Sequence, residues 1–404
     1  MITRGEQMLA LRRRRMAAAH PFLRGGFRPF FFGGALWAVF ALSMWLCSLA
    51  GAVSLPTEFD PLAWHRHEML FGFVGAVIAG FLLTAIPNWT GRLPIAGRPL
   101  LALFGLWFVA RIAVLFSGDI GAAPAALVDV GFYVVLAALA AREVLEAGNR
   151  NLPIVGMVLL FGLADALDHA SAAGLVEGDA GWQAATALIV LMISLIGGRI
   201  TPSFTRNWMT KRGVTQHLPT QPGRFDLLVI AATAVALLAW IIAPPGIIAG
   251  GLLLTAALLQ LVRLARWGGV RTASDPLVLI LHVGYAWVPI GLFLLGLGTA
   301  GMDIPRSAAI HALTAGAMAT MILAVMTRAS LGHTGRQLKA NAPTVLLYLL
   351  VTTGAIVRVA ASLGIGPYRV GMDLAGTLWA GALILFLIAY GPILWRPRLG
   401  EAAA

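Results

Sequence analysis

Long apolar runs alternate with short polar segments along almost the whole chain. As helices, runs of about 18 to 25 residues are long enough to cross a hydrocarbon core of about 30 Å. The pattern predicts twelve membrane-spanning helices joined by loops too short for a separate soluble domain. The predicted spans are 29–51, 61–87, 98–116, 122–145, 152–174, 181–204, 226–243, 246–266, 275–299, 304–328, 342–365 and 370–394.

The composition agrees with this pattern. Of the 404 residues, 59% are hydrophobic and 11% are charged, whereas charged residues make up about 25% of an ordinary soluble domain. We therefore expect an all-α polytopic membrane protein forming a single integral membrane domain over residues 1–404. Within it, residues 1–26 form a basic, amphipathic cytoplasmic segment and residues 27–396 form the helical bundle. The single cysteine, Cys47, excludes an intramolecular disulfide and a thiolate metal cluster.

The net charge of +12 would suit a nucleic-acid-binding protein, but the positions of the charges indicate membrane topology instead. With the N-terminus in the cytoplasm, Lys and Arg fall in the tails and the cytoplasmic loops, whereas acidic residues dominate the opposite loops. This asymmetry follows the positive-inside rule. We therefore expect both termini to be cytoplasmic and no nucleic-acid partner. The basic residues outside this pattern are Arg66, Arg111, Arg306, Arg358 and Arg369.

Polar residues recur in two parts of the chain at one fixed spacing. The pairs are His67 and His311, Thr90-Gly91-Arg92 and Thr334-Gly335-Arg336, and Asp129 and Asp373, each separated by 244 positions, as in 311 minus 67. Because polar groups inside a bilayer are costly, matched ones suggest a duplicated framework. The offset predicts a parallel repeat in which spans two to four resemble spans ten to twelve, related by an axis along the membrane normal.

Several of these polar residues are expected at one depth. His67 and His311 each lie six residues after a proline suited to a first helical turn, about 9 Å below the outer boundary. His169 reaches a similar level, and His65 lies about 3 Å above His67. His282 is the exception, about two turns from the cytoplasmic end of its span. The other residues of this polar layer are Glu68, Arg111, Asp129, Asp165, Asp168, Arg358 and Asp373.

Several imidazoles without a thiolate favour haem iron, copper or another borderline metal. We expect His67 and His311 to hold a haem iron, because they share a depth and a helix orientation. His65, His169 and His282 are then candidates for a second metal or for substrate protons, and His282 is also an alternative axial ligand. The competing interpretation of each single histidine is a hydrogen-bonding helix clamp. Residues i and i+2 point about 200° apart on a helix, so His65 and His67 are not expected to bind one ion.

The buried arginines have a structural and a functional interpretation. Arg111 is expected to pair with Asp129, and Arg358 with Asp373, because a lone charge at this depth is costly. Alternatively, Arg111 and Arg358 bind haem propionates or another anion. Glu68, beside His67, is expected to orient a ligand imidazole without contacting the metal itself. Alternatively, Glu68 and His65 transfer protons from the outer face.

Five segments of the chain resemble the NnrS family. They are GFRPFFFGGALWAVF (27–41), WHRHEMLFGFVGAVIAGFLLTAIPNWTGR (64–92), GGRITPSFTRNW (197–208), HVGYAWVPIGL (282–292) and HALTAGAMATMILAVMTRASLGHTGR (311–336). The resemblance implies a twelve-helix protein of the bacterial cytoplasmic (inner) membrane that contains haem and copper and accompanies denitrification and nitric oxide stress systems. It also implies functional roles for the family's recurrent polar positions, which are His65, His67, Glu68, His282, His311 and His333 here.

Together these observations predict a redox protein that binds nitric oxide at a buried haem, expected to be of the b type, and relieves its toxicity. Reduction of the gas would make it a nitric oxide reductase-like oxidoreductase with membrane quinol as electron donor. The alternative is a transporter or chaperone for haem, copper or a metal–nitrosyl species, because internal repeats are common in transporters. Helices broken at Pro202 or Pro289 would favour that alternative.

Overall fold

The computed structural model describes residues 7, 10, 14 and 17–400, and these residues form helices and loops without a strand. Within this part of the chain, twelve helices are long and apolar enough to cross a membrane, which confirms the all-α polytopic prediction. Half of the predicted basic N-terminal segment, residues 1–6, 8–9, 11–13 and 15–16, lies outside the described residues. The spans are Phe27–Leu49, Pro61–Thr90, Arg98–Leu115, Ala122–Glu146, Leu152–Ala172, Ala180–Lys211, Arg224–Ile242, Ile247–Ala265, Pro276–Thr299, Arg306–His333, Ala342–Ser362 and Tyr368–Trp395.

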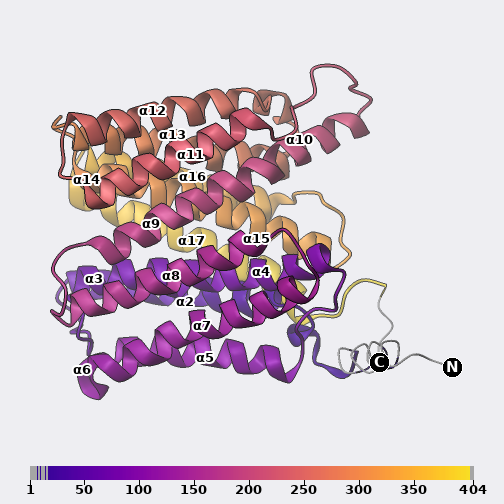
Figure 1. Ribbon diagram of the computed structural model, residues 1–404, viewed down its shortest axis with the longest axis horizontal. Helices are drawn as coiled ribbons and strands as arrows, with labels where there is room; N and C mark the ends of the chain where they lie inside the picture. Colours follow the sequence, from indigo (N-terminus) through magenta and orange to yellow (C-terminus); the bar gives the residue numbers. More distant parts are fainter. Residues whose placement is uncertain (1–6, 8–9, 11–13, 15–16, 401–404) are drawn as a thin grey trace. The chain divides into compact units, whose positions relative to one another are not determined.

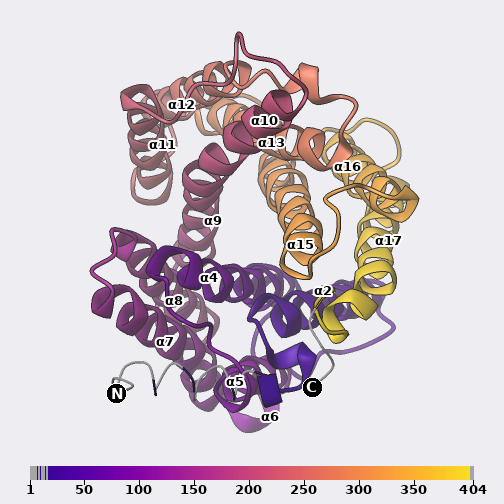
Figure 2. The ribbon, with the colours of Figure 1, turned by 90° about the vertical axis from the view of Figure 1, so that its right-hand side faces the viewer.

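The helices belong to two compact units. The first unit comprises residues 1–185, 329–337 and 386–404. In it α7 packs between α5 and α8, and α2 packs against α4 (Figure 1; Figure 2). Its elements are η1 (Pro21–Leu23), α2 (Phe27–Leu49), α3 (Pro61–His67), η2 (Glu68–Val74), α4 (Gly75–Thr90), α5 (Arg98–Leu115), α6 (Ser117–Ile120), α7 (Ala122–Glu146) and α8 (Leu152–Ala172).

The second unit comprises residues 186–328 and 338–385. Here α12 packs against α11 and α13, and α13 packs against η5. Three helices, α9, α15 and α17, continue from one unit into the other. The elements are α9 (Ala180–Met192), η3 (Ile193–Gly197), α10 (Gly198–Lys211), α11 (Arg224–Ile242), α12 (Ile247–Ala265), η4 (Gly269–Thr272), α13 (Pro276–Thr299), α14 (Arg306–His311), η5 (Ala312–Met318), α15 (Ala319–His333), α16 (Ala342–Ser362) and α17 (Tyr368–Trp395).

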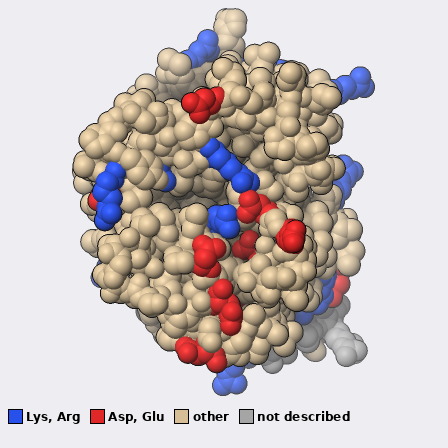
Figure 3. All heavy atoms as spheres, turned by 90° about the vertical axis from the view of Figure 1, so that its left-hand side faces the viewer, with Lys and Arg blue, Asp and Glu red and all other residues tan. Residues whose placement is uncertain are grey.

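Local sequence signals begin the second span. Asp60 accepts hydrogen bonds from the backbone N–H groups of Leu62 and Ala63, and Pro61 occupies the first helical position. These contacts satisfy donors that have no partner within the helix, and the proline supplies a preset φ. Asp and Glu side chains, drawn in red in Figure 3, gather on the face at which α3 begins. The chemistry of this entry turn therefore agrees with the predicted outer boundary of the span.

The two Thr-Gly-Arg motifs end their helices in the same way. Gly91 follows α4 with φ of 67°, and Gly335 follows α15 with φ of 73°, a region that glycine adopts without strain. The hydroxyl of Thr90 donates to the carbonyl of Ile86, and the hydroxyl of Thr334 donates to that of Ser330. These motifs are therefore helix C-caps, and their match has a structural cause.

Two π-helical segments also follow the 244-residue spacing. Segment η2 covers 68–74 and begins directly after His67, and η5 covers 312–318 and begins directly after His311. In a π-helix the backbone bonds run from i to i+5, which fits one extra residue into a turn and turns the following side chains. These local matches support the repeat, which stays a prediction for the longer segments.

Candidate metal centre

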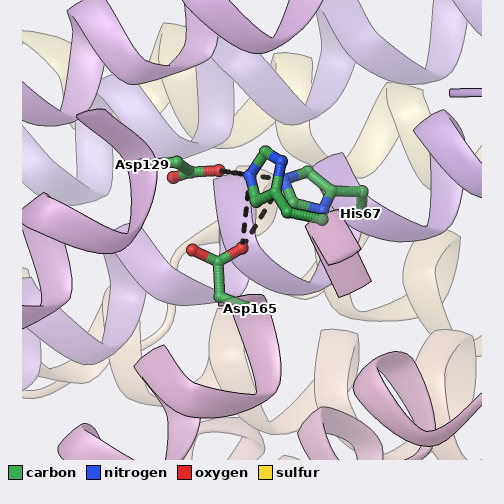
Figure 4. Close-up of side chains that lie close together, drawn as sticks. His67, Asp129 and Asp165 are labelled. Carbon is green, nitrogen blue, oxygen red and sulfur yellow. Dashed lines mark hydrogen bonds and ion pairs between the residues drawn. The ribbon is translucent and has the colours of Figure 1, made fainter. Parts of the chain in front are cut away.

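Four buried side chains of the first unit converge on one point. His67 comes from the end of α3, Asp129 from α7, and Asp165 and His169 from successive turns of α8. One ligand atom from each of the four lies within 4.8 Å of all the others. Figure 4 shows Asp129 and Asp165 directed at the imidazole of His67. We call these four residues the His/Asp centre.

The distances within the His/Asp centre place two carboxylates against two imidazoles. His67 Nε2 lies 2.9 Å from Asp129 Oδ2 and 3.7 Å from Asp165 Oδ1. His169 Nε2 lies 3.2 Å and 3.9 Å from the same two oxygens. The four atoms thus face a common space. Ligand atoms that each lie about 2.0–2.2 Å from one tetrahedral ion are separated from one another by about 3.3–3.6 Å, which is close to the separations found here.

Asp165 has an unusual environment within the centre. Its side chain is 0% exposed, and neither carboxylate oxygen has a hydrogen-bond donor in the part of the chain that the structure describes. A buried carboxylate without hydrogen bonds is unfavourable, even with two imidazole nitrogens 3.7 and 3.9 Å away. A cation held between Asp165 and its neighbours would remove this penalty, so the geometry suits a positive ion at this point.

Further polar residues surround the His/Asp centre from outside. His67 Nδ1 lies 2.9 Å from Asp168 Oδ2. Arg111 donates to Asp129 Oδ1 through one nitrogen and to both oxygens of Glu68 through another, at 3.0 and 2.9 Å. Trp37 also donates to Glu68. The predicted Arg111–Asp129 pair is confirmed, and Glu68 reaches the centre through Arg111.

Aromatic rings close the space around His67. The ring centroid of Phe59 lies 4.7 Å from that of His67, and the centroid of Phe71 lies 5.0 Å from it. Both phenylalanines are at most 5% exposed. In such an apolar surrounding, electrostatic interactions are stronger than in water.

The backbone of segment η2 is hydrogen-bonded to side chains from the helices that carry Asp129 and Arg111. Two side chains from neighbouring helices donate hydrogen bonds to backbone carbonyls of this π-helical turn. The hydroxyl of Tyr133 donates to the Phe71 carbonyl at 2.6 Å, and Trp107 Nε1 donates to the Gly72 carbonyl at 3.0 Å. A Cβ at Gly75 would overlap the Tyr133 hydroxyl. Helices α5 and α7 are therefore fixed against the turn that follows His67.

Other histidines predicted as ligands lie elsewhere. His65 stacks on Trp45 with centroids 4.1 Å apart, so it and His67 point to different surroundings, as expected. His282 and His311 belong to the second unit. His282 Nε2 lies 2.7 Å from the Thr205 hydroxyl, and His311 Nδ1 lies 2.7 Å from the Ser307 carbonyl. His333 is exposed at the end of α15.

The prediction that Arg358 pairs with Asp373 is wrong. Arg358 donates to Ser362 Oγ at 2.7 Å, one turn along its own helix. Asp373 pairs with Arg369, also one turn away, and its side chain is 56% exposed. Partners on the same helix turn satisfy each charge locally. In the second copy of the proposed repeat, Asp373 therefore lacks the buried polar contacts that Asp129 makes in the first copy.

The sequence placed Asp165 and Asp168 in the polar layer but did not assign them to a site. The available signal was the spacing of Asp165 and His169, which puts both on one helix face one turn apart. From the sequence, Asp129 is expected as a partner of Arg111 and as the repeat counterpart of Asp373, but not as a metal ligand. Its second oxygen, Oδ2, is the one that faces the centre.

The donor set of the His/Asp centre is two imidazole nitrogens and two carboxylate oxygens. Such a set suits zinc, iron, manganese or copper(II), and it lacks the soft sulfur ligands that copper(I) prefers. It does not suit a haem on His67, because both ring nitrogens of His67 already face carboxylates. We therefore assign no haem to His67.

Fold and site define a multi-pass helical membrane protein with a buried cluster able to hold a metal ion. A family model described as NnrS protein matches residues 21–398. The chain therefore belongs to the NnrS family, which suggests a role in nitric oxide-related metabolism. No curated protein matches the sequence.

Proposed function

We propose that this protein binds a metal ion at the His/Asp centre and uses it to bind nitric oxide and relieve its toxicity. The observation that supports the metal is Asp165, a fully buried carboxylate without a hydrogen-bond donor beside two histidines. Membership of the NnrS family supports the link to nitric oxide. A bound transition metal would supply a coordination position for the gas.

The surroundings of the centre suit a small uncharged ligand. The side chains of His67, Asp129 and Asp165 are 0% exposed, so the centre is shielded from water. Nitric oxide can dissolve in lipid and approach between helices, so a wide polar channel is not required. We propose that the protein lies in the bacterial cytoplasmic membrane with both termini in the cytoplasm.

Haem of the b type is a further part of the proposal, and His311 fits it better than His67. The bond from His311 Nδ1 to a backbone carbonyl orients the ring and leaves Nε2 for a metal, an arrangement common among metal-binding histidines. Arg358 lies within electrostatic range of His311 and would suit a propionate. His282 has the reverse arrangement: its Nε2 lies 2.7 Å from the Thr205 hydroxyl, and its buried Nδ1, which has no hydrogen-bond partner among the described residues, is the atom left for a metal.

Turnover of nitric oxide by reduction would need electrons and protons. We propose membrane quinol as the electron donor, and His65 remains our candidate for proton transfer. Glu68 fits a supporting role better than a catalytic one, because Arg111 and Trp37 hold its carboxylate. Transport of haem or copper is not favoured by a specific observation, since α10 and α13 continue through Pro202 and Pro289.

The proposal is tested on the full-length protein purified in detergent. Elemental analysis measures bound metal, the Soret band measures haem, and infrared spectroscopy measures the stretching band of added nitric oxide. We expect Asp129→Asn to lose most of the metal and its nitrosyl band. Asp373→Asn is the matched control, because Asp373 is exposed and lies at the equivalent position of the repeat; it should retain both. We expect His311→Ala to lose the Soret band.

Two results would overturn the metal proposal. One is wild-type protein that takes up no iron, copper or zinc after incubation with each ion. The other is an Asp129→Asn variant that binds metal as tightly as wild type. A nitrosyl band that is the same in the presence and absence of metal would contradict the role in binding the gas.

A further inference from the structure

His67 has different partners at its two ring nitrogens. Its Nε2 faces the His/Asp centre, where Asp129 and Asp165 lie, and its Nδ1 faces Asp168 at 2.9 Å. A metal-binding histidine commonly donates its second N–H to a carboxylate, which fixes the ring and its tautomer. The arrangement of Asp168 and His67 is of this kind.

We propose that Asp168 is a positioning residue that holds the His67 ring so that Nε2 is presented to a metal ion in the His/Asp centre. This inference rests on the proposed metal site and goes beyond it, because Asp168 is not among the four ligands. Asp168 is next to the ligand His169 in the sequence, but it acts on His67, a ligand from helix α3.

The helix geometry explains why Asp168 serves His67 and not the metal. Asp168 and His169 follow Asp165 by three and four residues, a spacing that places all three on one side of α8. Asp165 and His169 direct ligand atoms into the centre, whereas Asp168 meets the opposite edge of the His67 ring. Helix α8 therefore contacts both ring nitrogens of His67, Nε2 through Asp165 and Nδ1 through Asp168.

The backbone of Asp168 is held by a close helix contact. A Cβ placed on Gly181, near the start of α9, would collide with the backbone of Asp168 and with the carbonyl of Ala164. Glycine thus lets α9 pack directly against this turn of α8. A fixed backbone limits the movement of the Asp168 carboxylate, as a positioning role requires.

A second ligand is oriented in the same manner. Arg111 takes Oδ1 of Asp129 and leaves Oδ2 for the centre. His67 and Asp129 each have one polar atom facing inwards and the other held from outside. Asp165 has neither oxygen held, which leaves both available for an ion.

The test measures binding of Co²⁺, whose visible absorption reports coordination geometry, to the detergent-purified full chain. We compare wild type with Asp168→Ala, Asp168→Glu and the exposed-site control Asp373→Ala. Loss of an outer partner of a ligand typically lowers metal affinity about 10–100-fold. We expect that loss and a changed Co²⁺ spectrum for Asp168→Ala, partial recovery of both for Asp168→Glu, and wild-type behaviour for Asp373→Ala.

The outcomes separate this inference from the metal site itself. If wild type binds no Co²⁺, the His/Asp centre is not a metal site and the inference fails with it. If wild type binds Co²⁺ and Asp168→Ala binds it with the same affinity and spectrum, only the role of Asp168 is refuted. A variant that melts earlier but keeps the wild-type Co²⁺ spectrum would show a purely structural role and also refute it.

Discussion

Asp165 combines full burial with the absence of a hydrogen-bond donor for either oxygen among the described residues. Buried carboxylates normally have partners, and one without them destabilises the protein around it. Its neighbours, Asp129 and His67, are both held by other groups, so they cannot turn towards it at no cost. We therefore expect a cation bound beside Asp165 to stabilise the folded chain.

Replacing Asp165 by Asn should consequently have opposite effects in the two states. Without metal, removing a buried charge that has no hydrogen bond should stabilise the protein by about 1–3 kcal/mol. The stabilisation gained from metal, about 2.7 kcal/mol at a concentration 100 times Kd for wild type, should largely disappear. Thermal unfolding with chelator and with added metal measures both changes. A variant that is less stable with chelator and still gains stability from metal would contradict this account.

Segment η2 shows how a one-residue irregularity in a helix can shape a site. Two of its carbonyls accept hydrogen bonds from Tyr133 and Trp107, which come from helices α7 and α5. The same helices carry Asp129 and Arg111. The π-helical turn and the His/Asp centre are thus supported by the same pair of helices.

Replacing Tyr133 by Phe tests this link. The Phe71 carbonyl would lose the hydrogen bond from the Tyr133 hydroxyl, which should destabilise the protein by about 0.5–1.5 kcal/mol. We also expect weaker metal binding, because α7 carries Asp129. Tyr368→Phe is the control, since Tyr368 is 51% exposed. Thermal unfolding and Co²⁺ titration measure the two effects, and equal stability of both variants would argue against an anchoring role for Tyr133.

The sequence predicted the helices well because each span depends mainly on local hydropathy. It predicted the Arg111–Asp129 pair from depth and charge alone. The π-helical segments were not predicted, because one added residue barely changes an apolar pattern. The gathering of Asp165 and Asp168 around His67 was not predicted either, since it depends on how α3 and α8 are rotated towards each other.

The distribution of charge along the chain makes a prediction about topology. In a Cys47→Ser background, Glu177→Cys should react with a membrane-impermeant thiol reagent added to intact cells, because its loop is expected outside. Gln216→Cys should react only after the membrane is opened. Both positions are exposed in the structure. Labelling of both cysteines in intact cells would refute the predicted orientation.

Every member of the His/Asp centre, and Asp168 with Arg111, lies before position 170 of the chain. The second to the fifth spans therefore supply all of these groups, and the first five spans are synthesised before the remaining seven. The centre can be assembled and loaded during synthesis, while the second half of the protein is still being translated.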